Sequence, residues 1–150
     1  MLKSNSEVNR QKRRKLKEAD FDFLFTVPGL LPTLNEVIDS CKGNKMAYQR
    51  MKENLENLII WSAVSQRVPY YKEVELEITY YRPDRRHDPD NIVIGKKFIL
   101  DGLQKAGVLK NDGWKEVKGF KESWFVDKYD PRTEVILKIP KREMEARANA

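Results

Sequence analysis

The sequence predicts a single small α/β (α+β) domain in which a mixed β-sheet is layered with helices. Three observations support this: the length of 150 residues, a central region rich in aliphatic and aromatic side chains, and strand-like segments interleaved with helical periodicity. We expect the folded domain to span residues 21–140. A basic, flexible extension over residues 1–20 precedes it, and a charged tail over residues 141–150 follows it.

The N-terminal half predicts one strand and two helices. Phe21–Val27 is rich in aromatic and β-branched residues and ends at Pro28–Gly29, which predicts a strand. A connection rich in proline, glycine and asparagine follows, with a short helix expected over Leu34–Ser40. Apolar side chains then recur at helical spacing from Ala47 to Gln66, which predicts an amphipathic helix that Pro69 ends.

The C-terminal half predicts three strands and one helix. Glu73–Tyr81 alternates apolar and polar side chains, which indicates a half-buried strand with a solvated polar face. A helix is expected over Asn91–Gly107, capped at its start by Asp90 or by the asparagine and ended by the glycine. Two further strands are expected over Val117–Val126 and Thr133–Ile139.

Composition limits the classes of function. The chain has 29 Lys+Arg against 23 Asp+Glu, and the surplus of six positive charges favours a polyanionic partner, although charge alone suits an ordinary basic protein equally well. The single cysteine and single histidine exclude an internal disulfide and a His/Cys metal site, so we expect oxygen ligands for any metal. No apolar run reaches membrane-spanning length and no signal-peptide pattern is present, so a cytoplasmic location is expected.

Three aspartates in a basic segment are the candidate metal ligands. Asp88 and Asp90 follow the strand predicted over Glu73–Tyr81, and in extended backbone their carboxylates would point the same way. Asp112 follows the predicted helix, which could fold back to the same point. Two carboxylates about 4 Å apart repel by roughly 4 kcal/mol at an effective dielectric of about 20, and a bound Mg²⁺ or Mn²⁺ would convert that repulsion into ligation.

Basic and aromatic side chains surround these carboxylates. Lys97 shares a helix face with Asp101, and a lysine beside a carboxylate–metal cluster can offset charge on a scissile phosphate. Of the three tryptophans, we expect most to pack in the core, with Trp114 the best candidate for stacking on a base from an exposed position. The candidate contacts to a nucleic-acid backbone are Arg82, Arg85, Arg86 and Lys96.

Turns, helix caps and a second nuclease pattern also fit this segment. D-P-D-N and N-D-G are common sequences of turns and helix caps, which require no metal. Pro89–Asp90 with Glu116–Lys118 fits loosely the PD…ExK pattern of restriction-endonuclease-like folds, although strand alternation already explains the second part. An EF-hand fits poorly, because the sixth position counted from Asp88 is Val93 rather than glycine.

The segment from Arg82 to Asp112 resembles the RusA family of Holliday junction resolvases. The matching residues are RPDRRHDPDN and KKFILDGLQKAGVLKND, with a weaker likeness in VPGLLPTLNEVI. A few extra residues before the helix, and Asn111 where an aspartate can precede the third ligand, depart from the family pattern. The resemblance implies the metal ligands and catalytic residues Asp88, Asp90 and Asp112, and the active-site lysine Lys97, with Lys96 as the alternative.

The resemblance also implies an activity. It is that of a structure-selective endodeoxyribonuclease acting in DNA recombination and repair, which resolves four-way DNA junctions by paired, symmetric nicking. Mg²⁺, or Mn²⁺ in its place, would activate a water for in-line attack and leave 5′-phosphate ends, with no small-molecule cofactor. A two-fold homodimer would match the symmetry of the junction. A bacterial cell is the expected source, with the gene cellular or carried by a phage or prophage. The alternative function is a non-catalytic basic module that binds nucleic acid.

Overall fold

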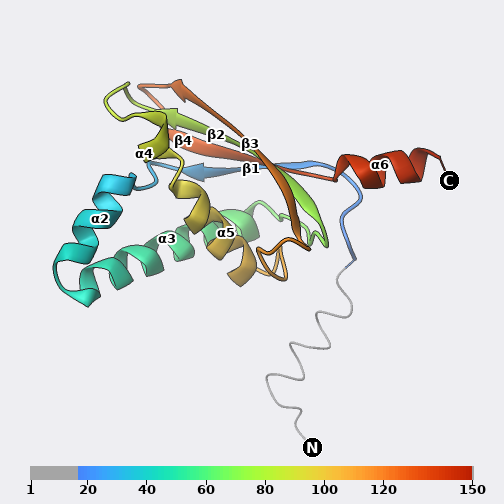
Figure 1. Cartoon of the computed structure of the whole chain (residues 1–150), viewed down its shortest axis with the longest axis horizontal. Helices are drawn as coiled ribbons and strands as arrows, with labels where there is room; N and C mark the ends of the chain where they lie inside the picture. Colours follow the sequence, from blue (N-terminus) through green and yellow to red (C-terminus); the bar gives the residue numbers. More distant parts are fainter. Residues whose placement is uncertain (1–16, 150) are drawn as a thin grey trace, which may run out of the picture.

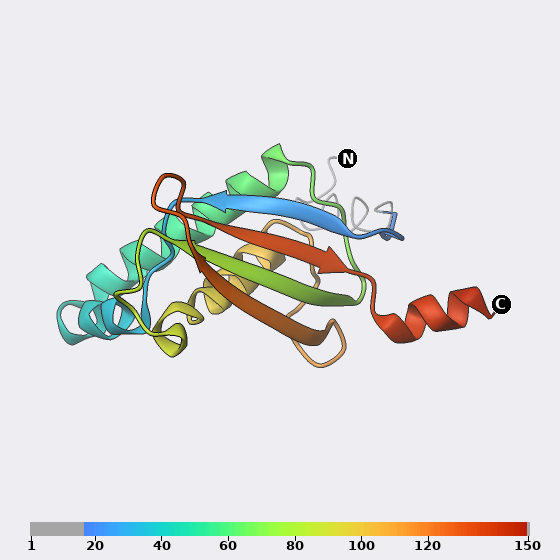
Figure 2. The ribbon, with the colours of Figure 1, turned by 90° about the horizontal axis from the view of Figure 1, so that it is seen from above.

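A four-stranded mixed β-sheet with helices packed on one face forms the body of the chain in the computed structural model, which describes residues 17–149 (Figure 1). The strands lie in the order β1-β4-β2-β3, with β2 and β3 parallel and the other pairs antiparallel (Figure 2). The predicted single α+β domain with a mixed sheet is confirmed. The elements in chain order are β1 (Phe23–Pro28), α2 (Leu34–Lys42), α3 (Lys45–Ser65), β2 (Val74–Arg82), α4 (Pro89–Ile92), α5 (Gly95–Lys105), β3 (Val117–Val126), β4 (Arg132–Lys138) and α6 (Lys141–Ala148).

Strand β2 lies inside the sheet, between β4 and β3, and shows the predicted alternation. Its apolar side chains from Val74 to Tyr80 are buried beneath the helices. Its opposite face is half-buried, and there Glu77 accepts a hydrogen bond from Lys138 Nζ at 2.9 Å. This bond holds the pKa of Glu77 below its usual range. The face predicted to be solvated is therefore crossed by ion pairs between neighbouring strands.

Helices α3 and α5 pack closely against each other under the sheet. A Cβ atom at Gly102 would overlap the Cβ and Cγ2 atoms of Ile59, so the two helices approach at a point where only glycine fits. Ile59, Ile99 and Leu103 are fully buried around this contact. Near it, Glu56 on α3 forms an ion pair with Lys105 on α5. The packing of α5 thus depends on a small residue in its middle.

The prediction of a single helix over Asn91–Gly107 is wrong in one respect, because two helices, α4 and α5, occupy this segment. Helix α4 begins at Pro89, whose fixed φ suits the first helical position, so Asp88 rather than Asp90 or Asn91 occupies the cap position. Between α4 and α5 the chain turns toward Gly95, where a Cβ atom would lie 2.9 Å from Leu31 Cδ1. The predicted end is confirmed, since Gly107 has φ +79° just after α5.

Both ends of the chain contain structure beyond the range of 21–140 expected for the folded domain. Most of the basic extension, including its cluster from Arg10 to Lys15, lies outside the described residues. Glu18 forms a parallel bridge to Tyr70, and Ala19 is buried, so the folded part begins before residue 21. The tail forms helix α6, which extends away from the sheet (Figure 1). None of the helices in the described part of the chain is long and apolar enough to cross a membrane.

The close approach of α3 and α5 predicts the effect of Gly102→Ala. We expect the added methyl group to lower the free energy of unfolding by about 1–3 kcal/mol, because two closely packed helices must move apart. Chemical denaturation measures this loss. Gly119→Ala is the control, since a Cβ atom there would meet only Glu75 Cγ at 3.9 Å, and we expect a change within about 0.5 kcal/mol. Equal losses in both variants would contradict the packing argument.

Candidate functional site

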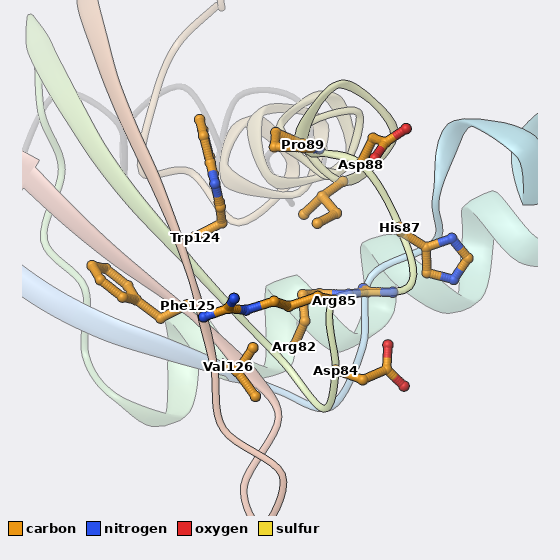
Figure 3. A pocket seen from close by; sticks show the side chains of 10 residues that line it. Arg82, Asp84, Arg85, His87, Asp88, Pro89, Trp124, Phe125 and Val126 are labelled. Carbon is orange, nitrogen blue, oxygen red and sulfur yellow. The ribbon is translucent and has the colours of Figure 1, made fainter.

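Two cavities lie on either side of α4, and together they contain most of the predicted site residues. The first, here called the carboxylate cavity, has a volume of about 400 Å³ and is lined by Asp90, Lys96, Lys97, Asp112 and Phe120, among others. The second, here called the arginine cavity, has a volume of about 370 Å³ and is shown in Figure 3. Its lining includes Arg82, Arg85, His87, Asp88 and Trp124.

The carboxylate cavity is built from three segments of the chain. Asp90 comes from α4, the two lysines come from the first turn of α5, and Asp112 comes from the loop after α5. Phe120 completes the wall from β3. Asp90 and Asp112 are both exposed, so a ligand can reach them from solvent. The structure thus places these two predicted ligands in the lining of one cavity.

The expected alignment of Asp88 with Asp90 is wrong. It assumed extended backbone, in which side chains two residues apart point the same way. Pro89 instead begins a helical turn, where each residue rotates by about 100° around the axis. Asp88 consequently lines the arginine cavity, and Asp90 lines the carboxylate cavity.

A metal site made of all three aspartates is therefore not assembled in this structure. Among the side chains that the structure describes (residues 17–141 and 145–149), no group of three or more histidine, cysteine, aspartate or glutamate residues could hold a metal ion. The pair of Asp90 and Asp112 does fit the way in which Mg²⁺ binds, because this ion keeps several waters and takes only one or two carboxylates beside substrate phosphates.

The two candidate lysines have different environments. Lys96 Nζ lies 2.7 Å from Glu122 Oε1 and 4.5 Å from the centre of the Phe120 ring. Tyr80 donates a hydrogen bond to the other oxygen of Glu122 at 2.9 Å, and burial followed by the nearby negative charge raises the pKa of Tyr80. Lys96 is therefore held in one place by a network that reaches into the core.

Lys97 is held less firmly. Its side chain is 61% exposed, and its Nζ lies 3.6 Å from Asp101 Oδ2, as the spacing of four residues predicted. An ion pair whose cation is this exposed contributes little to stability, so the ammonium can leave it for a ligand at small cost. This makes Lys97 the more mobile cation of the carboxylate cavity.

The predicted backbone contacts divide into two kinds. Arg85 and Arg86 are exposed on the loop after β2, where they can reach a phosphate directly. Arg82 is only 8% exposed and donates a hydrogen bond to the carbonyl oxygen of Leu31 at 3.1 Å. Arg82 also lines the arginine cavity, where a ligand could reach it, and the pattern of charges did not indicate this.

The prediction that most tryptophans pack in the core is wrong. Trp61 and Trp124 are 62% and 48% exposed, and Trp114 is exposed as expected, at 97%. Sequence reasoning also missed Glu122, the partner of Lys96. The sequence did contain an indication of its position. Residues two apart on a strand share a face, so Glu122 was expected on the same face as Trp124.

No protein-family model matches the chain, and no curated protein matches it in sequence. Among solved structures, the periplasmic domain of Helicobacter pylori MotB is 13% identical, over 89% of this chain and 93% of that domain, with a TM-score of 0.40. A similarity this low shows neither a shared family nor a shared fold.

The network around Lys96 predicts the effect of Glu122→Gln. We expect the free energy of unfolding to fall by about 1–3 kcal/mol, because the half-buried ammonium loses its charged partner. Urea denaturation measures this change. Asp101→Asn makes the same substitution of charge beside the exposed Lys97, and there we expect less than about 0.5 kcal/mol. A loss at Asp101 as large as that at Glu122 would refute the distinction between the two lysines.

Proposed function

We propose that the chain is a Mg²⁺-dependent endonuclease of the RusA kind, which resolves four-way DNA junctions by paired nicking. The observation that carries the proposal is the carboxylate cavity, where Asp90 and Asp112 meet Lys96 and Lys97 although they come from separate segments. Carboxylates beside ammonium groups suit a divalent cation acting on a phosphate. The net charge of +6 supports a polyanionic substrate.

The residues of the carboxylate cavity have distinct roles in this proposal. Asp90 and Asp112 hold the cation, which when bound supplies Lewis acidity toward a backbone phosphate. Lys97 leaves Asp101 and offsets negative charge that develops on the phosphate oxygens. Lys96, held by Glu122, contributes a positive charge in a fixed position. Arg85 and Arg86 bind flanking phosphates, which makes affinity fall steeply with salt.

A homodimer is part of the proposal. A four-way junction has two-fold symmetry, and a dimer with the same symmetry offers two equivalent cavities to two opposing strands. Each subunit then nicks one strand and leaves a 5′-phosphate end. Selectivity comes from the shape of the junction and the spacing of the two cavities, because backbone contacts carry no base sequence.

A non-catalytic module that binds nucleic acid is the second candidate. It is favoured by the absence of a three-ligand acidic cluster among residues 17–141 and 145–149. In that case Asp88 and Asp90 serve only the start of α4, where acidic residues suit the helix dipole.

Cleavage of a synthetic four-way junction separates the two candidates. With Mg²⁺ we expect symmetric nicks, and Asp90→Asn should slow nicking by about 100-fold or more while binding is kept or tightened, because a negative charge is removed. Denaturing gels measure the nicks and gel shifts measure the binding. Asp39→Asn, an exposed change of equal charge on α2, should leave both unchanged. Binding of the wild-type chain without nicks in either Mg²⁺ or Mn²⁺ would rule out the enzyme.

Binding of Mn²⁺ tests the ligand set separately from cleavage. We expect Asp90→Asn and Asp112→Asn each to weaken Mn²⁺ binding by about tenfold or more, since each removes one of two anionic ligands. Asp88→Asn should leave the affinity nearly unchanged, because Asp88 lines the other cavity. Electron paramagnetic resonance of free Mn²⁺ measures the affinity. An equal loss of Mn²⁺ affinity in Asp88→Asn would contradict the two-ligand site and support a site made of all three aspartates.

A further inference from the structure

The arginine cavity is lined by the side chain of Arg82, which forms no salt bridge among the described residues although carboxylates lie near it. Arg82 is 8% exposed, and among the described residues its hydrogen bond goes to the carbonyl of Leu31, with no ion pair. Burial lowers the pKa of Arg82, and the negative charges of Glu36 and Asp84 act in the opposite direction with a smaller effect. The remaining donors of Arg82 are not sealed from solvent, and because Arg82 lines the cavity they are available to a ligand with acceptor atoms there.

The wall of the cavity that faces Pro89 and Asp88 offers an aromatic surface. Trp124 is half-exposed on β3, and Figure 3 shows its ring across the cavity from Pro89 and Asp88. A single exposed indole beside arginine donors suits stacking of a nucleobase. A cavity of about 370 Å³ is in the range of pockets that hold small planar ligands.

The polar lining suits the edge of a base better than a bare anion. Donors of Arg82 and Arg85 lie in the same cavity as acceptors of Asp84 and Asp88, so the lining carries both signs. Nucleobases present donors and acceptors along one edge. A phosphate alone would be repelled by the two carboxylates as well as attracted by the arginines.

The arginine cavity also lies beside the carboxylate cavity. Asp88 and Asp90 flank Pro89 and line one cavity each. On β3, Phe120 and Trp124 share a face and also line one cavity each, about 13 Å apart along the strand. A strand that places a phosphate near Asp90 can therefore place a nearby base against Trp124.

We propose that the arginine cavity binds one unpaired nucleobase of a DNA strand, stacked on Trp124 with its polar edge toward Arg82. The inference rests on the proposed function for the nature of the strand. It adds a binding site that accepts only a base freed from its pair. Arg85, an exposed residue that also lines the cavity, then holds the adjoining phosphate.

Fluorescence of 2-aminopurine in a short single-stranded oligonucleotide tests the site, in EDTA so that no cleavage occurs. Stacking on Trp124 should change the emission on binding, and the same label paired in a duplex should respond far less. Trp124→Ala should abolish the change and weaken binding by about 5- to 150-fold, whereas Trp124→Phe should keep much of both. The matched control is Trp114→Ala, because Trp114 is exposed but does not line this cavity.

The outcomes distinguish this inference from the nuclease. An emission change that depends on Trp124 supports the base site even if no junction is ever nicked. An unchanged response in Trp124→Ala, or a response lost only in Trp114→Ala, would overturn it. The inference would also be overturned if the labelled oligonucleotide bound to the wild type with no change in 2-aminopurine emission and a phosphorylated peptide displaced it. Arg85→Ala, on an exposed loop, should weaken binding and reduce its salt dependence without abolishing the emission change.

Discussion

The parallel pairing of β2 with β3 is the constraint on which the position of both cavities depends. Parallel strands cannot be joined by a tight turn, so the chain leaves β2, crosses one face of the sheet as α4 and α5, and returns to start β3 at the same end. This crossing lays α4 beside the edge strand. The contact between Gly102 and Ile59 then sets how closely α5 lies against α3. Each cavity is a space between the crossing segment and β3.

The sequence predicted the elements better than their arrangement. The burial of β2 follows from side-chain alternation, which is a local property, and the bounds of β3 are those predicted. The orientation of Asp88 relative to Asp90 depended on whether Pro89 begins a helix or continues a loop, and the residue type allows both. The convergence of Asp90 with Asp112 depended on the length and direction of α5. Trp124 was mispredicted because composition does not tell which strand forms the edge of the sheet, and Trp61 because composition does not tell which face of α3 is left uncovered.

The charges of the carboxylate cavity are arranged so that one cation is fixed and one is mobile. Lys96 is tied to Glu122, which is tied in turn to the buried hydroxyl of Tyr80. Among the described residues, the ion pair of Lys97 is with the carboxylate of Asp101, one helical turn away. Adjacent residues on a helix point about 100° apart, so two neighbouring lysines can meet different surroundings. The pattern K-K therefore gives no indication of which ammonium responds to a ligand.

The pairing of β2 with β3 also has a consequence for how the chain folds. Val74 and Val117 become neighbours only after the whole crossing segment has been brought back, whereas β4 follows β3 through a short turn. Contacts between residues far apart in sequence carry a large loop-closure entropy and slow folding. A slip of β3 by one residue would turn Glu122 away from Lys96 and Tyr80. The ion pair that fixes Lys96 thus also favours the correct register of β3.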